Sequence, residues 1–99
     1  MTCFHRTDHA AAILRDGFVD GEGSYGFVSL TLRGVWISDE PLDVNEGAAG
    51  TQLLALTFPE AVRLDPYEIH EEMKTYREWC VPAEVINSQA SVLLVVDEP

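Results

Sequence analysis

The sequence predicts one α+β domain of five or six short strands and two or three short helices. The chain has 99 residues, which is the length of one domain. Apolar residues make up 46% and charged residues 23%, a globular composition. Short β-rich runs alternate with loops and with an alanine-rich segment, and no repeat or linker divides them.

The first third of the chain predicts a strand followed by a helix. Residues 2–7 form the strand, with Cys3 and Phe4 as its apolar bulk. Asp8 is a good N-cap for the alanine-rich helix that follows, and Gly17 is suited to the left-handed position that closes it. The glycine-containing residues 20–24 then predict a flexible loop.

The middle of the chain predicts three extended segments. Residues 27–32 are extended, Arg33-Gly34 forms a turn or bulge, and residues 35–38 form a short β-rich run. Residues 43–50 form a second polar loop. The clearest strand spans residues 52–58 and is stopped by Pro59.

The last third predicts two short helical segments and two strands. Residues 66–74 carry one or two helical turns, with Pro66 at the first position. Residues 78–81 form a short strand ended by Pro82, and residues 82–86 form one more turn. The continuous apolar run at residues 91–96 predicts a final strand in the centre of the sheet.

The bulk properties exclude several classes of protein. A formal net charge of −11 disfavours tight nucleic-acid binding, so a protein or small molecule is the expected partner. No apolar run reaches the ~20 residues that span a membrane, and the first residues do not resemble a signal peptide, so we expect a cytoplasmic protein without membrane contact. Cys3 and Cys80 are expected to be free thiols, and no metal site is predicted.

Three ordered segments carry the chemistry. Phe4-His5-Arg6-Thr7 ends the first strand, residues 33–39 read Arg-Gly-Val-Trp-Ile-Ser-Asp, and residues 76–87 contain Glu78-Trp79-Cys80-Val81. This trio resembles the ADP-ribosyltransferase superfamily in its histidine–tyrosine–glutamate branch, which includes the poly-ADP-ribose polymerases and the diphtheria-type toxins. The resemblance covers nearly the whole chain and implies a small fold of two packed sheets.

The resemblance implies a role for each matching residue, with NAD as the substrate. His5 contacts the adenine-side ribose, and Thr7 supports the same site. Trp36 takes the place of the tyrosine that stacks on nicotinamide, and Glu78 bonds the 2′-hydroxyl of the nicotinamide-side ribose. Arg6 and Ser38 complete the expected cofactor-binding set, Glu78 and His5 are the expected catalytic pair, and no metal takes part.

The chemistry suits these residue types. Breaking the nicotinamide–ribose bond builds positive charge on the sugar, so a fixed carboxylate at Glu78 lowers the barrier. Tryptophan is the best aromatic partner for a flat cation, which fits Trp36. The imidazole of His5 offers one donor and one acceptor to a ribose hydroxyl. We therefore expect mono-ADP-ribosyl transfer to an unknown acceptor, or NAD hydrolysis.

Departures from the family pattern leave alternatives open. Arg6 stands where the family has a small glycine, and Trp36 is larger than tyrosine. These changes favour, as the alternative, an inactive module on the same fold that binds a nucleotide, a peptide or a protein. A structural histidine at His5, a core tryptophan at Trp36 and a solvated glutamate at Glu78 are the ordinary explanations of these residues. A 2′-phosphotransferase-like activity ranks last, because the chain lacks that site's many histidines and arginines.

Overall fold

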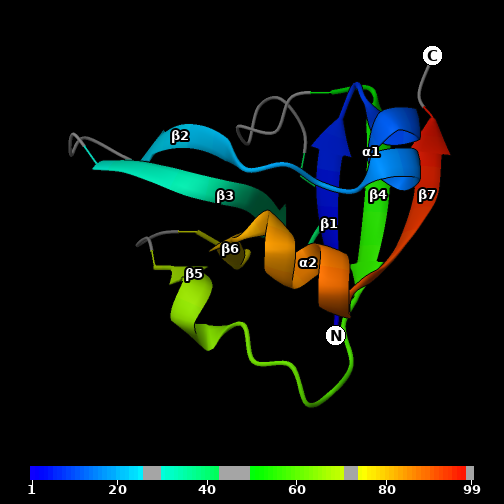
Figure 1. Cartoon of the computed structure of the whole chain (residues 1–99). Coiled ribbons are helices and arrows are strands. Elements are labelled where there is room, and N and C mark those ends of the chain that lie inside the picture. Colours follow the sequence, from blue (N-terminus) through cyan, green and yellow to red (C-terminus); the bar gives the residue numbers. More distant parts are fainter. Residues whose placement is uncertain (26–29, 43–49, 71–73, 98–99) are drawn as a thin grey trace.

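The computed structural model describes residues 1–25, 30–42, 50–70 and 74–97 and places seven strands in one antiparallel sheet. Six strands follow the order β5-β6-β3-β1-β4-β7, and β2 pairs with β3 beside this path (Figure 1). The strands are β1 (Thr2–Thr7), β2 (Gly21–Tyr25), β3 (Leu30–Ser38), β4 (Gln52–Thr57), β5 (Glu68–Ile69), β6 (Glu78–Val81) and β7 (Ser91–Asp97). The helices are α1 (Ala10–Asp16), α2 (Ala83–Gln89) and the 3₁₀ helix η2 (Asp65–Tyr67).

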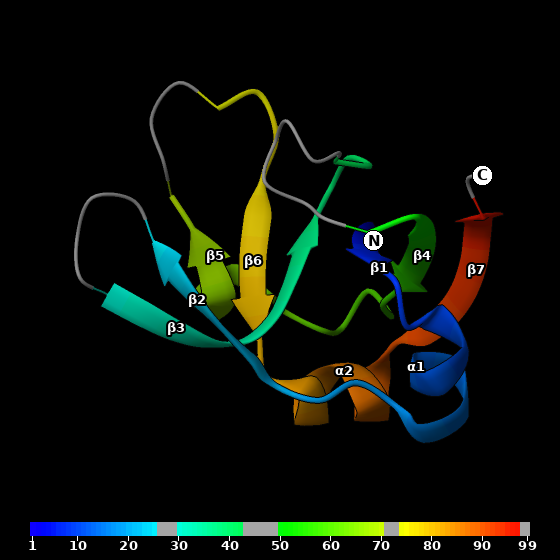
Figure 2. The same ribbon diagram turned by 90° about the horizontal axis from the view of Figure 1, so that it is seen from above.

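The sheet turns sharply between β1 and β3. Strands β1, β4 and β7 run side by side, whereas β3, β6 and β5 form a second group that crosses them (Figures 1 and 2). The ladder between β1 and β3 has one register pair, Phe4 with Ser38, whereas β1 and β4 pair along six residues. The α+β class is therefore confirmed, but the strands form one connected sheet, and the expected two separate sheets are not observed.

The core fills the concave side of this bent sheet. The inward-facing side chains of the strands are almost fully buried: Cys3, Val35, Ile37, Leu54, Leu56, Trp79 and Val81. Ile86 from α2 and Phe18 from the segment after α1 are buried against them. Each fully buried large apolar side chain stabilises the fold by about 1.5–3 kcal/mol. Figure 2 shows α1 and α2 together on one side of the sheet.

The glycine-rich segment before β3 differs from the prediction. Residues 20–24 were expected as a loop, but residues 21–25 form β2, which pairs along its whole length with β3. Gly34 is not a turn but lies inside β3, between the part that pairs with β2 and the part that pairs with β6. A Cβ at Gly34 would lie 2.9 Å from the carbonyl oxygen of Val81, so this close strand approach needs glycine.

The segment predicted as helical at residues 66–74 is helical only at its start. Pro66 lies in η2, but Glu68 and Ile69 form β5 against β6. Residues 71–73 lie outside the described residues. A short edge strand here satisfies the backbone groups of β6, which local helix propensity does not take into account.

Both helix termini also differ from expectation. The N-cap of α1 is His9, and the carboxylate of Asp8 instead accepts hydrogen bonds from the amide and hydroxyl of Thr51. Helix α2 (Ala83–Gln89) extends beyond the single turn expected at residues 82–86, so Asn87 lies inside it.

The final strand lies at an edge, not at the centre. β7 ends the strand order and pairs with β4. Its apolar run predicts burial on both faces, yet Leu93 and Val95 are exposed.

The two cysteines are free thiols, as expected. Cys3 is buried and Cys80 half-buried, and burial raises the pKa of Cys3 to about 11. In the described part of the chain, no helix has the length and apolarity needed to cross a membrane.

Candidate functional site

The three strands that carry the sequence motifs are neighbours in the sheet. His5 lies on β1, Trp36 and Ser38 on β3, and Glu78 on β6, and the order β6-β3-β1 places them on adjacent strands. Ser38 is directly opposite Phe4 on one side and Glu78 on the other. Segments far apart in the sequence therefore meet in the middle of the sheet.

The register divides the candidate residues between the two faces of the sheet. Directly opposed residues share a face, and neighbours along a strand alternate. Ser38 and Glu78 therefore share the face away from the core, and Trp36 lies on the same face opposite Cys80. Arg6, two residues after Phe4, belongs to this outer face as well.

His5 and Thr7 belong to the core face. They alternate with Phe4 and Arg6 and follow the fully buried Cys3. The register thus gathers Arg6, Trp36, Ser38 and Glu78 on the outer face and separates His5 and Thr7 from them. The alternation of side chains was visible in the sequence, but the pairing that decides the faces was not.

His5 links β1 to β3 where their ladder stops. Its Nδ1 lies 2.7 Å from the carbonyl oxygen of Trp36, and its ring meets Phe18 edge-on at 5.3 Å. A carbonyl only accepts, so Nδ1 carries the proton and Nε2 of the neutral ring is an acceptor. Burial lowers the pKa of His5, and the bond to the Trp36 carbonyl opposes this shift. His5 is therefore held neutral between the two strands.

Arg6 and the two hydroxyl residues bond to nearby backbone. The Nε of Arg6 donates to the carbonyl of Leu42 at 2.5 Å. Thr7 Oγ1 accepts from the amide of His9 at 2.9 Å, and Ser38 Oγ donates to the carbonyl of Glu40 at 2.6 Å. These bonds fix the start of α1 and the turn after β3, so each hydroxyl has a structural role.

Glu78 is held by a lysine from the preceding segment. Lys74 Nζ donates to Glu78 Oε1 at 2.6 Å, and the side chain of Glu78 is 14% exposed. The same ammonium lies 5.1 Å from the centre of the Tyr76 ring. The carboxylate is therefore a nearly buried anion with one oxygen bonded to a cation on the outer face.

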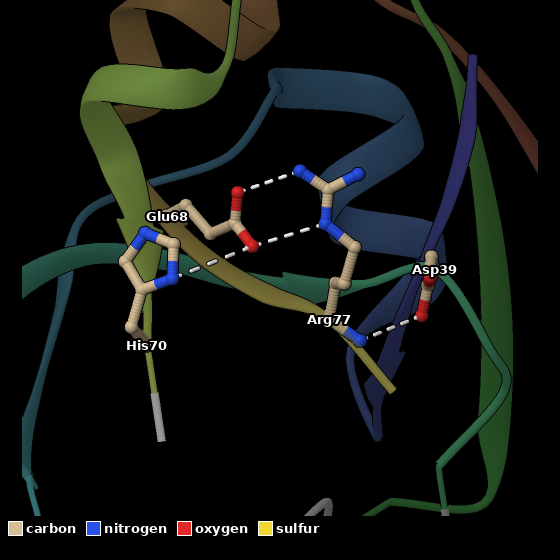
Figure 3. A network of polar contacts seen from close by, with 4 residues as sticks. All are labelled: Asp39, Glu68, His70 and Arg77. Carbon is tan, nitrogen blue, oxygen red and sulfur yellow. Dashed lines mark hydrogen bonds and ion pairs between the residues drawn. The ribbon is translucent and has the colours of Figure 1, made fainter. Parts of the chain in front are cut away.

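A polar network that the sequence did not predict is centred on Arg77, the residue before Glu78 in the chain (Figure 3). Arg77 donates through Nε and Nη2 to the two oxygens of Glu68, and its backbone amide donates to Asp39. These hydrogen bonds from Arg77 lower the pKa of Glu68. His70 Nδ1 lies 4.0 Å from Glu68. The network joins β5, the turn after β3 and the start of β6, and no motif spacing in the sequence signals it.

Arg77 also covers the core tryptophan. Its guanidinium lies 5.0 Å above the ring of Trp79, whose indole nitrogen has no hydrogen-bond partner among residues 1–25, 30–42, 50–70 and 74–97. Beside them is an open cavity of about 230 Å³. It is lined by Met1, Pro59, Glu60, Val62, Arg63, Leu64, Asp65, Arg77 and Trp79. None of the six candidate residues lines this cavity.

Comparisons with protein-family models, with curated proteins and with solved structures found no match to this chain.

Proposed function

We propose that this chain is a small ADP-ribosyltransferase-like protein that binds NAD and transfers ADP-ribose to an unknown acceptor or to water. One observation carries the proposal: the strands of the three motifs are adjacent, and Trp36, Ser38 and Glu78 share one face. Short motifs that lie far apart in the sequence have no local reason to meet, so their adjacency supports a common site.

Glu78 is the residue proposed to stabilise the transition state. When the bond between nicotinamide and ribose breaks, nicotinamide leaves with the bonding electrons and positive charge develops on the sugar. A nearly buried carboxylate stabilises that charge without reorganising. Lys74 occupies Oε1, so Oε2 is the oxygen assigned to the ribose 2′-hydroxyl. The incoming nucleophile then bonds to the sugar carbon and releases its proton to solvent.

The outer-face residues are proposed to bind and orient the dinucleotide. Trp36 offers its half-buried ring on the same face as Glu78 and stacks on the nicotinamide. Arg6 and Ser38 are assigned supporting positions on this face. His5 and Thr7 lie on the core face, so they are assigned an indirect role: His5 holds the backbone of Trp36 through its Nδ1 bond to the Trp36 carbonyl, and Thr7 holds the start of α1.

Calorimetry and product release test this proposal. Isothermal titration with NAD should give saturable heat, and chromatography should show release of nicotinamide. Glu78→Gln should retain NAD binding and lose about 100-fold or more of the release rate, as removal of an electrostatic stabiliser does. Glu84→Gln, the same change at an exposed residue of α2, should behave as the wild type. Absence of NAD binding, or full activity in Glu78→Gln, contradicts the proposal.

The alternative is a binding module without catalysis. It is favoured by the engagement of His5, Arg6 and Glu78 with protein groups, because a ligand would have to compete with these bonds. In that case the protein binds NAD and ADP-ribose equally well, or binds neither, and releases no nicotinamide. Measuring both affinities beside the release rate separates the two functions.

A further inference from the structure

The cavity beside Trp79 has an apolar floor. It lies between the segment that links β4 to η2 and the start of β6, and its volume is about 230 Å³. Leu64 and Trp79 are buried and Val62 is half-buried, so apolar side chains form its base. Common ligand sites measure roughly 300–1,000 Å³, so this smaller cavity suits a small ligand with an apolar part.

The rim of the cavity carries charges of both signs. Glu60, Arg63, Asp65 and Arg77 line it and have exposed positions. Arg77 is already bonded to Glu68. In the described part of the chain, the side chains of Glu60 and Arg63 form no hydrogen bond or ion pair, either with each other or with another residue. A carboxylate and a guanidinium are therefore both open to a ligand.

Trp79 adds an unsatisfied donor to the same cavity. Its indole Nε1 is buried and has no hydrogen-bond partner among the residues that the structure describes. Buried polar groups nearly always have a partner, so an N–H without one marks a place where an acceptor is expected. A carboxylate oxygen is a strong acceptor, and it also suits the guanidinium of Arg63.

We infer that this cavity binds a free α-amino acid with an apolar side chain of about the size of leucine. Arg63 and the indole N–H of Trp79 are assigned to its carboxylate, Glu60 to its ammonium group, and the apolar floor to its side chain. Trp79 is closed to water in this structure, and the guanidinium of Arg77 lies 5.0 Å above its ring. The exposed Arg77 side chain therefore shifts when the carboxylate reaches the indole.

The charges select a zwitterion over a simple anion or cation. A carboxylate without an ammonium group would meet Glu60 and Asp65, and the field of a chain with net charge −11. An amine without a carboxylate would leave Arg63 and the indole N–H unpaired. A free amino acid satisfies both signs and carries no net charge. None of the six residues assigned to NAD lines the cavity, so the inference does not rest on the proposed function.

Nuclear magnetic resonance with isotope-labelled tryptophan tests this site, because the chain has two tryptophans and hence two indole signals. Trp36→Phe assigns them. Leucine added over a range of about 0.1 to 20 mM should move the Trp79 signal to saturation and leave the Trp36 signal unchanged. Isocaproate lacks the ammonium group and leucinamide lacks the carboxylate, so each should bind at least about 10-fold more weakly than leucine.

Substitutions at the rim leave the apolar floor intact. Arg63→Gln and Glu60→Gln should each weaken leucine binding at least about fivefold, and Glu60→Gln should tighten isocaproate because it removes a repelling carboxylate. Arg15→Gln, the same change at an exposed arginine of α1 outside the cavity, should bind leucine as the wild type does. The inference is overturned if leucine does not move the Trp79 signal, if the three probes bind equally, or if the rim variants match Arg15→Gln.

Discussion

Asn87 is the residue that ties the two helical segments together. Its Oδ1 accepts from the amide of Phe18 at 2.8 Å, and its Nδ2 donates to the carbonyl of Phe18 at 3.0 Å. Phe18 packs in the core and meets the ring of His5. Asn87 thereby fixes the chain after α1 against α2, a role that its place in the sequence did not signal.

Asn87→Ala should lower the free energy of unfolding by about 2 kcal/mol, because it leaves two backbone groups of Phe18 without partners. Urea unfolding measures the change. The stability of Asn87→Asp should fall between that of the wild type and that of Asn87→Ala. The aspartate keeps the acceptor for the Phe18 amide but places a carboxylate against the Phe18 carbonyl. Ser88→Ala, at an exposed neighbour in α2, should cost less than about 0.5 kcal/mol. If Asn87→Ala lowered the free energy of unfolding as little as Ser88→Ala, the proposed role of Asn87 in holding Phe18 would be wrong.

The backbone of Gly50 packs closely against the backbone of Thr7 at the end of β1. Its φ is +132°, and a Cβ there would lie 2.6 Å from the amide nitrogen of Thr7. Gly50→Ala should therefore destabilise the protein by about 2–4 kcal/mol, from backbone strain and from displacement of β1. Thermal unfolding measures the loss. Gly21→Ala is the matched control, because among the described residues the nearest atom to its Cβ would be the Gly34 carbonyl oxygen at 3.7 Å, and it should change stability by less than about 1 kcal/mol.

For the candidate residues, the sequence predicted the strands on which they lie but not the faces of the sheet or their ion-pair partners. The motifs predicted the strands of His5, Trp36 and Glu78, because short apolar runs ending at proline or a polar loop are local signals. They did not predict the faces, which depend on the pairing of Phe4 with Ser38. Nor did they predict Lys74 or Arg77 as partners, since an ion pair depends on how separate segments fold back on each other.

At the scale of elements, the junction of β1 and β3 has the shortest ladder among the described strands, one register pair, and His5 adds a bond across it. The pKa of His5 is lowered by burial, so the folded protein binds this proton less readily than the unfolded chain. Stability contributed by neutral His5 is thus present above the unfolded value of 6.5 and is lost as pH falls below it. The loss amounts to at most about 1.4 kcal/mol per pH unit until the folded group titrates.

Urea unfolding between about pH 7.5 and 5.5 should show this decline in the wild type, and His5→Asn should show a smaller one. Asparagine keeps an N–H for the Trp36 carbonyl but does not titrate. His9→Gln, at an exposed position, should retain the wild-type slope. The lowered pKa of Glu68 also makes the protein less stable as pH falls, but only below the ordinary glutamate value of 4.5. The range from about pH 7.5 to 5.5 therefore excludes the contribution of Glu68. An unchanged slope in His5→Asn would show that another group is responsible.

The elements also show why some predictions were wrong. β1, β4 and β6 carry β-rich residues that predict strands without help from the rest of the chain. β2 is rich in glycine and forms a strand because β3 provides its partner. β7 has the pattern of a buried central strand but lies at the edge, because a continuous apolar run does not specify how many neighbours it has.

At the scale of the whole molecule, the net charge of −11 opposes the compact state. The chain has 17 acidic residues but six lysines and arginines, so the acids outnumber the bases that could pair with them. Most carboxylates therefore repel one another across a small surface. Unfolding separates them, so repulsion lowers the free energy of unfolding, and screening should restore it.

The unfolding temperature should consequently rise steeply as sodium chloride increases from about 10 to 150 mM, where the screening length shortens to about 8 Å, and then level off. Calorimetry or fluorescence at about 1 µM protein keeps any concentration-dependent self-association from contributing. A double variant with Ala11→Lys and Gln89→Lys adds two positive charges at exposed helix positions and should respond less. A response equal to the wild type, or one that appears only at molar salt, would assign the effect to ion-specific hydration of the surface instead of charge repulsion.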